Sequence, residues 1–126
     1  MKKDIKSNLD VVQSLAPAAR TASANGSGVD LQDYLGAMVV FELGAKTDGT
    51  HTPSVEESDD NSTFSAVAAA DLLGSLSAMS ANTVQRVGYI GSKRYIRAVM
   101  TVSGATTGAL SSAVVVRGEP KLAPLS

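Results

Sequence analysis

The chain has 126 residues, with 11 Lys and Arg against 12 Asp and Glu, and 44% of its residues are hydrophobic. This length suits one domain, and the near balance of charge argues against non-specific nucleic-acid binding, which needs a strong basic excess. There is no Cys and one His, His51, which excludes disulfides, thiolate metal sites, a Cys nucleophile and a multi-histidine zinc site.

Aromatic residues make up only 4% of the chain, without Trp, so we expect an aliphatic core and no platform for stacking sugars or bases. No stretch approaches the roughly 20 apolar residues of a membrane span. Asp4, Lys6 and Asp10 interrupt the region where a signal peptide would be apolar. These features predict a protein that is made without secretion, needs no cofactor, is not an enzyme, and binds neither membrane nor nucleic acid.

Residues 1–28 differ from the rest and are predicted to form an N-terminal arm. Apolar residues recur every three or four positions before Pro17, as on one side of a short helix, and small and polar residues with two glycines follow. A disordered tail is the alternative, but a tail that only confers solubility would not need this apolar stripe. We expect the arm to order against a partner through Ile5, Leu9, Val11, Val12, Leu15 and Arg20.

From residue 29 onward the pattern is that of β-strands. Residues 35–43 place Leu35, Ala37, Val39, Phe41 and Leu43 on one side, and the other side, which carries Met38 and Val40, is also largely apolar. Such a strand is expected in the middle of a sandwich or beneath another subunit. The stretch 44–53 is predicted as a hairpin connection with Gly49 at positive φ and His51 exposed.

Two short strands, 54–58 and 63–67, are expected to pair around an acidic turn. Glu56, Glu57, Asp59 and Asp60 lack the spacing of a calcium loop, so a solvated turn is the expectation. A helical turn is predicted over 68–73 and a loop over 75–83.

The last third predicts a hairpin of strands 84–90 and 93–102, joined by Gly91 and Ser92, and a final strand over 110–118 that Pro120 and Pro124 close off. The fold expected for residues 29–126 is all-β: an antiparallel β-sandwich or jelly roll, preceded by the extended arm. The hairpin would place Arg86 opposite Arg97 on a face with Tyr95. These three residues form either an interface or a solvated face whose arginines pair with Glu42, Glu56 or Glu57.

Four segments carry a resemblance: VVQSLAPAARTASANGSGVDL, TDGTHTPSVEESDDNSTFSAVAAADLLG, VGYIGSKRYIRAVMTVSGATTGA and VVVRGEPKLAP. They resemble a family of small structural proteins encoded in the head-gene clusters of tailed bacteriophages and prophages. The pattern ESDDNSTFSAV followed by KRYIRAVMTV also resembles the discoidin-like jelly rolls, although Ala98 stands at the last position of their motif and their tryptophans are absent.

The resemblance implies a virion part, and within that class a capsid decoration (cement) protein on the outer surface of the shell. Such a protein is made in the cytoplasm of the bacterial host, binds the major capsid protein, and forms a homo-oligomer, for which a trimer is favoured. A subunit that binds only the assembled lattice stabilises that lattice by mass action. Two alternatives remain open: a tail or head–tail joining component, and a carbohydrate-binding module for adhesion to the host.

Overall fold

The computed structural model describes residues 1–120, which form two β-sheets packed face to face with two short 3₁₀ turns. The strands and turns, in chain order, are η1 (Lys6–Asn8), β1 (Leu9–Arg20), β2 (Ala24–Asn25), β3 (Val29–Asp30), β4 (Tyr34–Lys46), β5 (Thr50–Ser58), β6 (Ser65–Ala66), η2 (Ala69–Asp71), β7 (Leu72–Leu73), β8 (Thr83–Tyr89), β9 (Tyr95–Ser103) and β10 (Ala109–Pro120).

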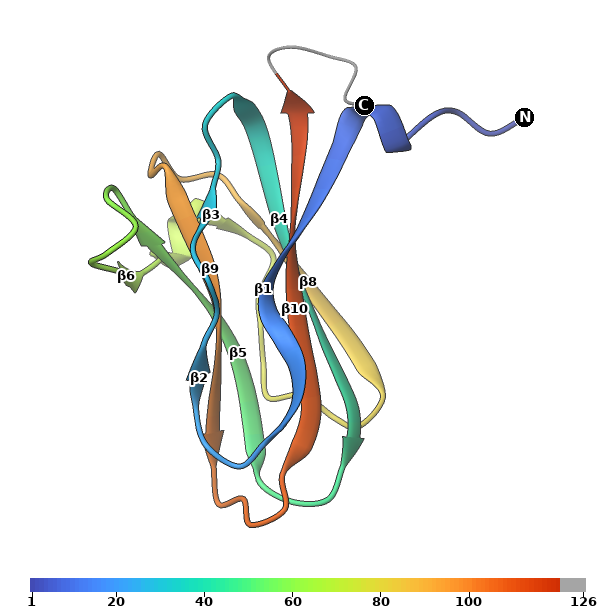
Figure 1. The fold of residues 1–126 in the computed structure, drawn as a ribbon, viewed down its shortest axis with the longest axis vertical. Helices are drawn as coiled ribbons and strands as arrows, with labels where there is room; N and C mark the ends of the chain where they lie inside the picture. The colour runs from blue at the N-terminus through green and yellow to red at the C-terminus, as the bar shows by residue number, and fades with distance from the viewer. Residues whose placement is uncertain (121–126) are drawn as a thin grey trace.

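One sheet, which we call sheet A, has the strand order β1-β10-β4-β8-β7, and the other, sheet B, has the order β2-β9-β5-β6 with β3 paired to β9 (Figure 1). All pairings are antiparallel. The chain passes repeatedly from one sheet to the other, and β10 lies between β1 and β4. This order is that of a jelly roll, so the predicted all-β sandwich is confirmed.

The core lies between the two sheets and is built largely by alternation along the strands. Val39, Phe41 and Leu43 of β4 point inward and are buried, and they face Ile96 and Met100 of β9. Aliphatic side chains from every long strand complete the core. The predicted alternation of residues 35–43 is therefore correct, and β4 is the middle strand of sheet A.

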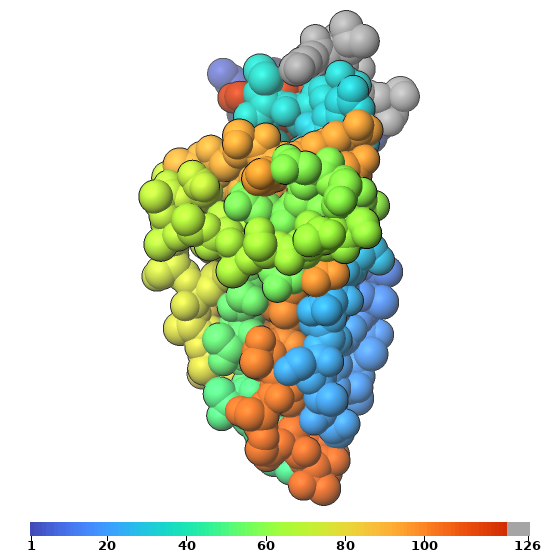
Figure 2. Space-filling model, turned by 90° about the vertical axis from the view of Figure 1, so that its left-hand side faces the viewer, coloured from blue at the N-terminus to red at the C-terminus, as the bar shows by residue number. Residues whose placement is uncertain are grey.

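The segment between β5 and β8 closes one side of the sandwich. Its turn 59–62 leads to β6, which pairs with β5, and η2 then brings the chain to β7, which pairs with β8 of the other sheet. Figure 2 shows this green to yellow-green segment across the upper half of that side. The predicted 54–58/63–67 pair, helical turn and following loop match this arrangement.

The predicted N-terminal arm is wrong for most of its length. Residues 9–20 are an edge strand of sheet A, in which Leu9 pairs with Gly118 and Leu15 is buried in the core. The register shifts between Gln13 and Leu15 and again before Ala18. These bulges break the two-residue alternation, so that the apolar positions follow a three-residue spacing that resembles a helix. Within the predicted arm, residues 1–8 precede the sheets, and residues 21–23 and 26–28 are short connections between strands.

Two predicted hairpins are also wrong, because their strands belong to different sheets. Strands β4 and β5 are joined through Gly49, which does adopt positive φ, and strands β8 and β9 through Gly91 and Ser92, yet each pair is split between sheets A and B. The last strand is predicted at the right place but is not an edge. Pro120 still pairs with Tyr34, and Pro124 lies outside the described residues.

Candidate interaction surface

The outer face of sheet A carries an apolar surface that nothing in the described chain covers. Met38 and Val40 of β4 point outward, and their register partners Val116 and Val114 of β10 stand beside them. Val11 of the edge strand extends the row and is 60% exposed. We call this surface the apolar face; its residues are Val11, Met38, Val40, Leu73, Val84, Val114 and Val116.

Two charged residues lie on the apolar face. Arg86 of β8 is opposite Val40, and Glu42 of β4 is opposite Val84. Both side chains are exposed, and neither takes part in an ion pair within residues 1–120. Arg86 instead approaches the Met38 sulfur at 4.0 Å. Monomeric proteins rarely expose large contiguous apolar patches, so this sheet face is the candidate interaction surface of the described chain.

At one end of the apolar face the surface deepens into a groove of about 830 Å³, which we call the end groove. Gly36 lies at its base, paired with Gly118, and no heavy atom comes within 4 Å of the position that a Gly36 Cβ would occupy. Exposed leucines and an isoleucine surround the base. The groove is lined chiefly by Leu9, Leu31, Leu35, Gly36, Tyr89 and Ile90.

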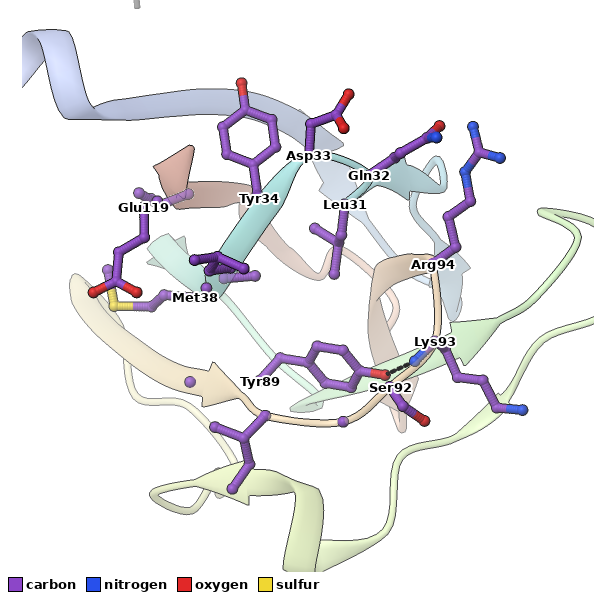
Figure 3. A pocket seen from close by; sticks show the side chains of 18 of the residues that line it. Leu31, Gln32, Asp33, Tyr34, Met38, Tyr89, Ser92, Lys93, Arg94 and Glu119 are labelled. Carbon is purple, nitrogen blue, oxygen red and sulfur yellow. Dashed lines mark hydrogen bonds between the residues drawn. The ribbon is translucent and has the colours of Figure 1, made fainter. Parts of the chain in front are cut away.

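Buried polar contacts fix the walls of the end groove. The Tyr89 hydroxyl donates to Glu57 Oε1 at 2.8 Å and accepts from the Lys93 backbone N–H at 3.0 Å, so it ties β8 to β5 and holds the loop between β8 and β9. Burial raises the pKa of Tyr89 to about 12, and the hydrogen bond to Glu57 acts in the same direction. Figure 3 shows Leu31 and Tyr89 projecting into the groove.

Arg117 braces the same end of the sandwich from within. Its guanidinium pairs with Asp10 of β1, donates to the Asp30 carbonyl at 2.9 Å, and stacks on the Tyr34 ring at 4.4 Å from the centroid. Asp30 in turn accepts two hydrogen bonds from Arg94. The bonds from Arg94 hold the pKa of Asp30 at about 2. These linked contacts hold β1, β3, β4 and β10 together at this end of the sandwich.

The rim of the end groove has an uneven charge. Its basic side chains are engaged, because Lys93 pairs with Asp59 and Arg94 with Asp30. The carboxylates of Asp33 and Glu119 are exposed, and within the described residues they have no ion-pair partner. Figure 3 places Glu119 and Lys93 on opposite sides of the groove. The groove thus combines apolar lining residues with two carboxylates, Asp33 and Glu119, that form no ion pair within residues 1–120.

The outer face of sheet B is polar, and its charges are paired. Arg97 donates to Glu56 at 2.6 Å and lies over the Phe64 ring at 4.1 Å from the centroid. The neighbouring outward positions on β5 and β9 are Thr52, Ser54 and Thr101, together with the apolar Val99, which is only 7% exposed. The alternative in which Arg97 pairs with an adjacent glutamate is confirmed. Tyr95 and Arg97 lie in sheet B and Arg86 in sheet A, so the predicted shared face is wrong.

The acidic turn stabilises itself through local hydrogen bonds. Asp60 accepts the backbone N–H groups of Ser62 and Thr63 and the Ser58 hydroxyl, and these bonds, that of Thr63 foremost, lower the pKa of Asp60 to about 2. The nearby carboxylates of Glu56, Glu57 and Asp59 each have another partner. No group of three or more His, Asp or Glu side chains within residues 1–120 is arranged to hold a metal ion.

His51 lies in the core rather than in an exposed loop. It is the second residue of β5 and is 0% exposed. Its Nε2 is 3.0 Å from the Asp48 carbonyl oxygen, while Nδ1 is buried without a hydrogen-bond partner. The prediction of an exposed histidine failed because the strand begins earlier than the residues after Gly49 indicate.

The structure separates the residues predicted to contact a partner. Leu9, Val11 and Arg86 lie on the outer side of sheet A, at the groove or on the apolar face, and Ile5 projects beyond the sheet with 66% exposure. Val12 and Leu15 pack inward. Arg20 stabilises its own fold rather than facing a partner, since its guanidinium donates to the carbonyl groups of Ala16, Ala18 and Ser111.

The sequence interpretation missed the groove and much of the apolar face. Val84, Val114 and Val116 alternate with buried positions, but without strand pairing nothing showed that their outward sides align. Gly36 and Gly118 are far apart in sequence and meet only through the register of β4 and β10. One signal was present: the apolar second side of residues 35–43, which predicted a strand in the middle of a sandwich or beneath another subunit.

No family model matches the sequence, and no curated protein matches it. Among solved structures, the chain is similar to the SPBc2 prophage-derived protein YomS, with a TM-score of 0.52 and 13% identity over 92% of this chain and 100% of that one. A second structure, from work on Bacillus endospore appendages that form disulfide-linked pili, has a TM-score of 0.44 and 11% identity over 100% of this chain and 98% of that one. At these identities, the likeness to YomS shows a shared fold, and that neighbour is prophage-derived. No helix within the described residues has the length and apolarity to cross a membrane.

Proposed function

We propose that the protein is a non-enzymatic structural part of a phage particle, and specifically a decoration protein that binds the assembled head shell through its apolar face. The observation that carries the proposal is the contrast between the outer faces of the two sheets. One bears seven apolar residues together with Gln13, Ser112 and two charges, whereas the other is mainly polar, with Val99 as an apolar residue and with Arg97 paired to Glu56. The resemblance to phage head proteins and the prophage origin of a neighbour of the same fold support this class.

A shell surface is a suitable partner for such a face. A flat sheet covers a broad area of another protein without rearranging, because its side chains are held by the strands behind them. Burial of apolar area drives association at roughly 25 cal/mol per Å² before the cost of immobilisation. Repetition over a lattice multiplies a modest single contact. The two charges on the face, Arg86 and Glu42, would fix the register on the shell rather than provide most of the affinity.

The test is binding to shells assembled without this protein, measured by co-sedimentation. We expect Val84→Asp combined with Val114→Asp to lower the affinity at least tenfold, about 1.4 kcal/mol. The matched control is Thr52→Asp combined with Thr101→Asp, which adds the same charges to the outer face of sheet B and should leave binding unchanged. Equal binding by both double variants, at unchanged melting temperatures, would contradict the proposal.

Copy number separates the decoration role from the tail and head–tail alternatives. Quantitative mass spectrometry of purified particles should find the protein in hundreds of copies. A few or a few dozen copies would place it in the neck or tail and overturn the decoration role, while leaving a virion role in place.

A further inference from the structure

The first six residues form a basic and apolar segment that makes few contacts with the rest of its own chain. Lys2, Lys3 and Lys6 outnumber the one acid, Asp4, and Met1 and Ile5 are both largely exposed. None of the three lysines takes part in an ion pair within residues 1–120. Figure 1 shows the segment leaving the sandwich at the end that carries the end groove, on the side away from β4.

A local structure directs the segment away from its own groove. Asp4 Oδ1 accepts the Ser7 backbone N–H at 3.2 Å, and the Asn8 N–H donates to the Ile5 carbonyl at 3.0 Å. These bonds form the 3₁₀ turn η1 immediately before β1 begins at Leu9. An apolar side chain at position 5 is thus presented to the surroundings, which costs free energy unless another molecule covers it.

The end groove has the properties complementary to this segment. Its base is apolar and open above Gly36, so a branched aliphatic side chain can enter it. Its rim carries Asp33 and Glu119, whose carboxylates lack ion-pair partners in the described chain, whereas the segment carries lysines that also lack them. Both the apolar character and the sign of the charge therefore match.

We propose that residues 1–6 of one copy bind in the end groove of a second copy, with Ile5 over Gly36 and the lysines beside Asp33 and Glu119. The two surfaces of the contact differ, so each copy can donate a segment to one neighbour and accept one from another. Contacts of this kind close into rings or continue as open chains. This inference goes beyond the shell contact, because it concerns the isolated protein and a different surface.

The decisive experiment uses two single variants of the full chain, alone and mixed, in sedimentation-velocity ultracentrifugation over a range of concentrations. Ile5→Asp disables the segment but leaves the groove open, and Gly36→Phe fills the groove but leaves the segment intact. The wild type should self-associate, and each variant alone should do so at least tenfold more weakly. An equimolar mixture should form a 1:1 dimer and nothing larger, because it contains one functional segment and one functional groove.

Several outcomes would overturn the inference. They are a monomeric wild type throughout the concentration range, a variant that associates as the wild type does, and a mixture that yields no dimer. Leu110→Asp is the matched control, since it charges an exposed leucine at the other end of β10 and should not alter association. Melting temperatures show that each variant is folded. Gly36→Phe should fold, because no neighbouring heavy atom lies within 4 Å of the Cβ position at residue 36.

Exchange of charge tests the ionic part of the contact. A chain with Asp33→Lys and Glu119→Lys should not accept the wild-type segment, and a chain with Lys2→Glu, Lys3→Glu and Lys6→Glu should not enter the wild-type groove. Mixing the two should restore association, and the restored contact should weaken as salt rises. If mixing the two chains does not restore association, the lysines do not take part in the contact.

The shell experiment distinguishes this inference from the proposed function. Suppose that Ile5→Asp binds undecorated shells as tightly as the wild type does, and that Val84→Asp combined with Val114→Asp binds them weakly. The apolar face is then the shell contact, whatever the ultracentrifugation shows. If copies associate in solution but do not bind shells, the proposed function fails and the segment–groove contact stands.

Discussion

His51 is a polar residue in an otherwise apolar core. Its ring is fully buried near the start of β5, and its Nε2 lies within hydrogen-bond distance of the Asp48 carbonyl oxygen. The backbone of β5 also binds the segment before β8, because the Met79 N–H donates to the His51 carbonyl at 2.8 Å. The imidazole therefore fills space and fixes the turn between the two sheets.

We predict that His51→Ala lowers the free energy of unfolding by about 2–4 kcal/mol, because it leaves a cavity and removes a partly buried hydrogen bond to the Asp48 carbonyl. Denaturant unfolding followed by circular dichroism measures the effect. A change below about 0.5 kcal/mol would mean that the ring is exposed in solution.

Asp30 and Asp60 predict the response of the fold to acid. Their pKa values of about 2 lie below the ordinary 3.8, through hydrogen bonds from Arg94 and from the Thr63 backbone respectively. A lower pKa in the folded chain means that the unfolded chain binds more protons between these values. The stability that these carboxylates contribute is complete above pH 3.8 and is lost as the pH falls through about 2.

The melting temperature should therefore fall steeply between pH 4 and pH 2. Asp60→Asn should melt lower than the wild type at pH 7 and approach it at pH 2, as scanning calorimetry would show. Parallel curves for the two proteins would rule out the Asp60 carboxylate as a source of the acid sensitivity.

At the scale of elements, Ser14 joins β1 to the opposite sheet. Its hydroxyl donates to the Ser27 carbonyl at 2.8 Å and accepts the Ala98 N–H of β9 at 2.9 Å, in a site where Ser14 is only 4% exposed. Strand β1 is thus bound to β10 along one edge and to sheet B through a side chain.

Ser14→Ala should cost about 1–3 kcal/mol, because the Ala98 N–H then has no acceptor in a buried site. Ser23→Ala is the control: the Ser23 hydroxyl accepts the Val102 N–H at 2.9 Å in the same way, but in an exposed position where water can replace it. Urea unfolding compares the two, and equal losses would refute the role of burial.

The sequence predicted the strands better than it predicted their partners. Alternation in 35–43 reports which side is buried, because burial is a local requirement of each strand. Gly91 and Ser92 look like a hairpin turn, yet β8 and β9 enter different sheets, a choice that depends on the packing of the whole sandwich. The bulges in β1 gave its apolar residues a helix-like spacing, so this strand was not predicted. The groove was beyond prediction because its glycines meet only through register.

At the scale of the whole molecule, the two outer faces differ in character. The apolar face, with Val11 60% and Val84 57% exposed, contrasts with a sheet B face in which Arg97 is held by Glu56. A folded monomer with this asymmetry should bind apolar surfaces by one side.

The folded protein should be retained on a hydrophobic-interaction column, and Val11→Lys combined with Val84→Lys should shorten its retention markedly. Thr52→Lys combined with Thr101→Lys adds the same charge on the other face and should shorten it far less. Identical shortening would mean that retention reports net charge alone.

The central position of β10 in sheet A has a consequence for synthesis in the cell. Strand β1 has β10 as its ladder partner, and β4 is bounded by β10 on one side, so a nascent chain that has not reached residue 109 has an unpaired first strand and half a sheet. The rows of side chains that make the apolar face, and the glycine pair beneath the groove, do not exist in that fragment. The outer surface of sheet A is therefore completed in one step, when the last strand inserts, and a chain that ends before residue 109 lacks both the apolar face and the end groove.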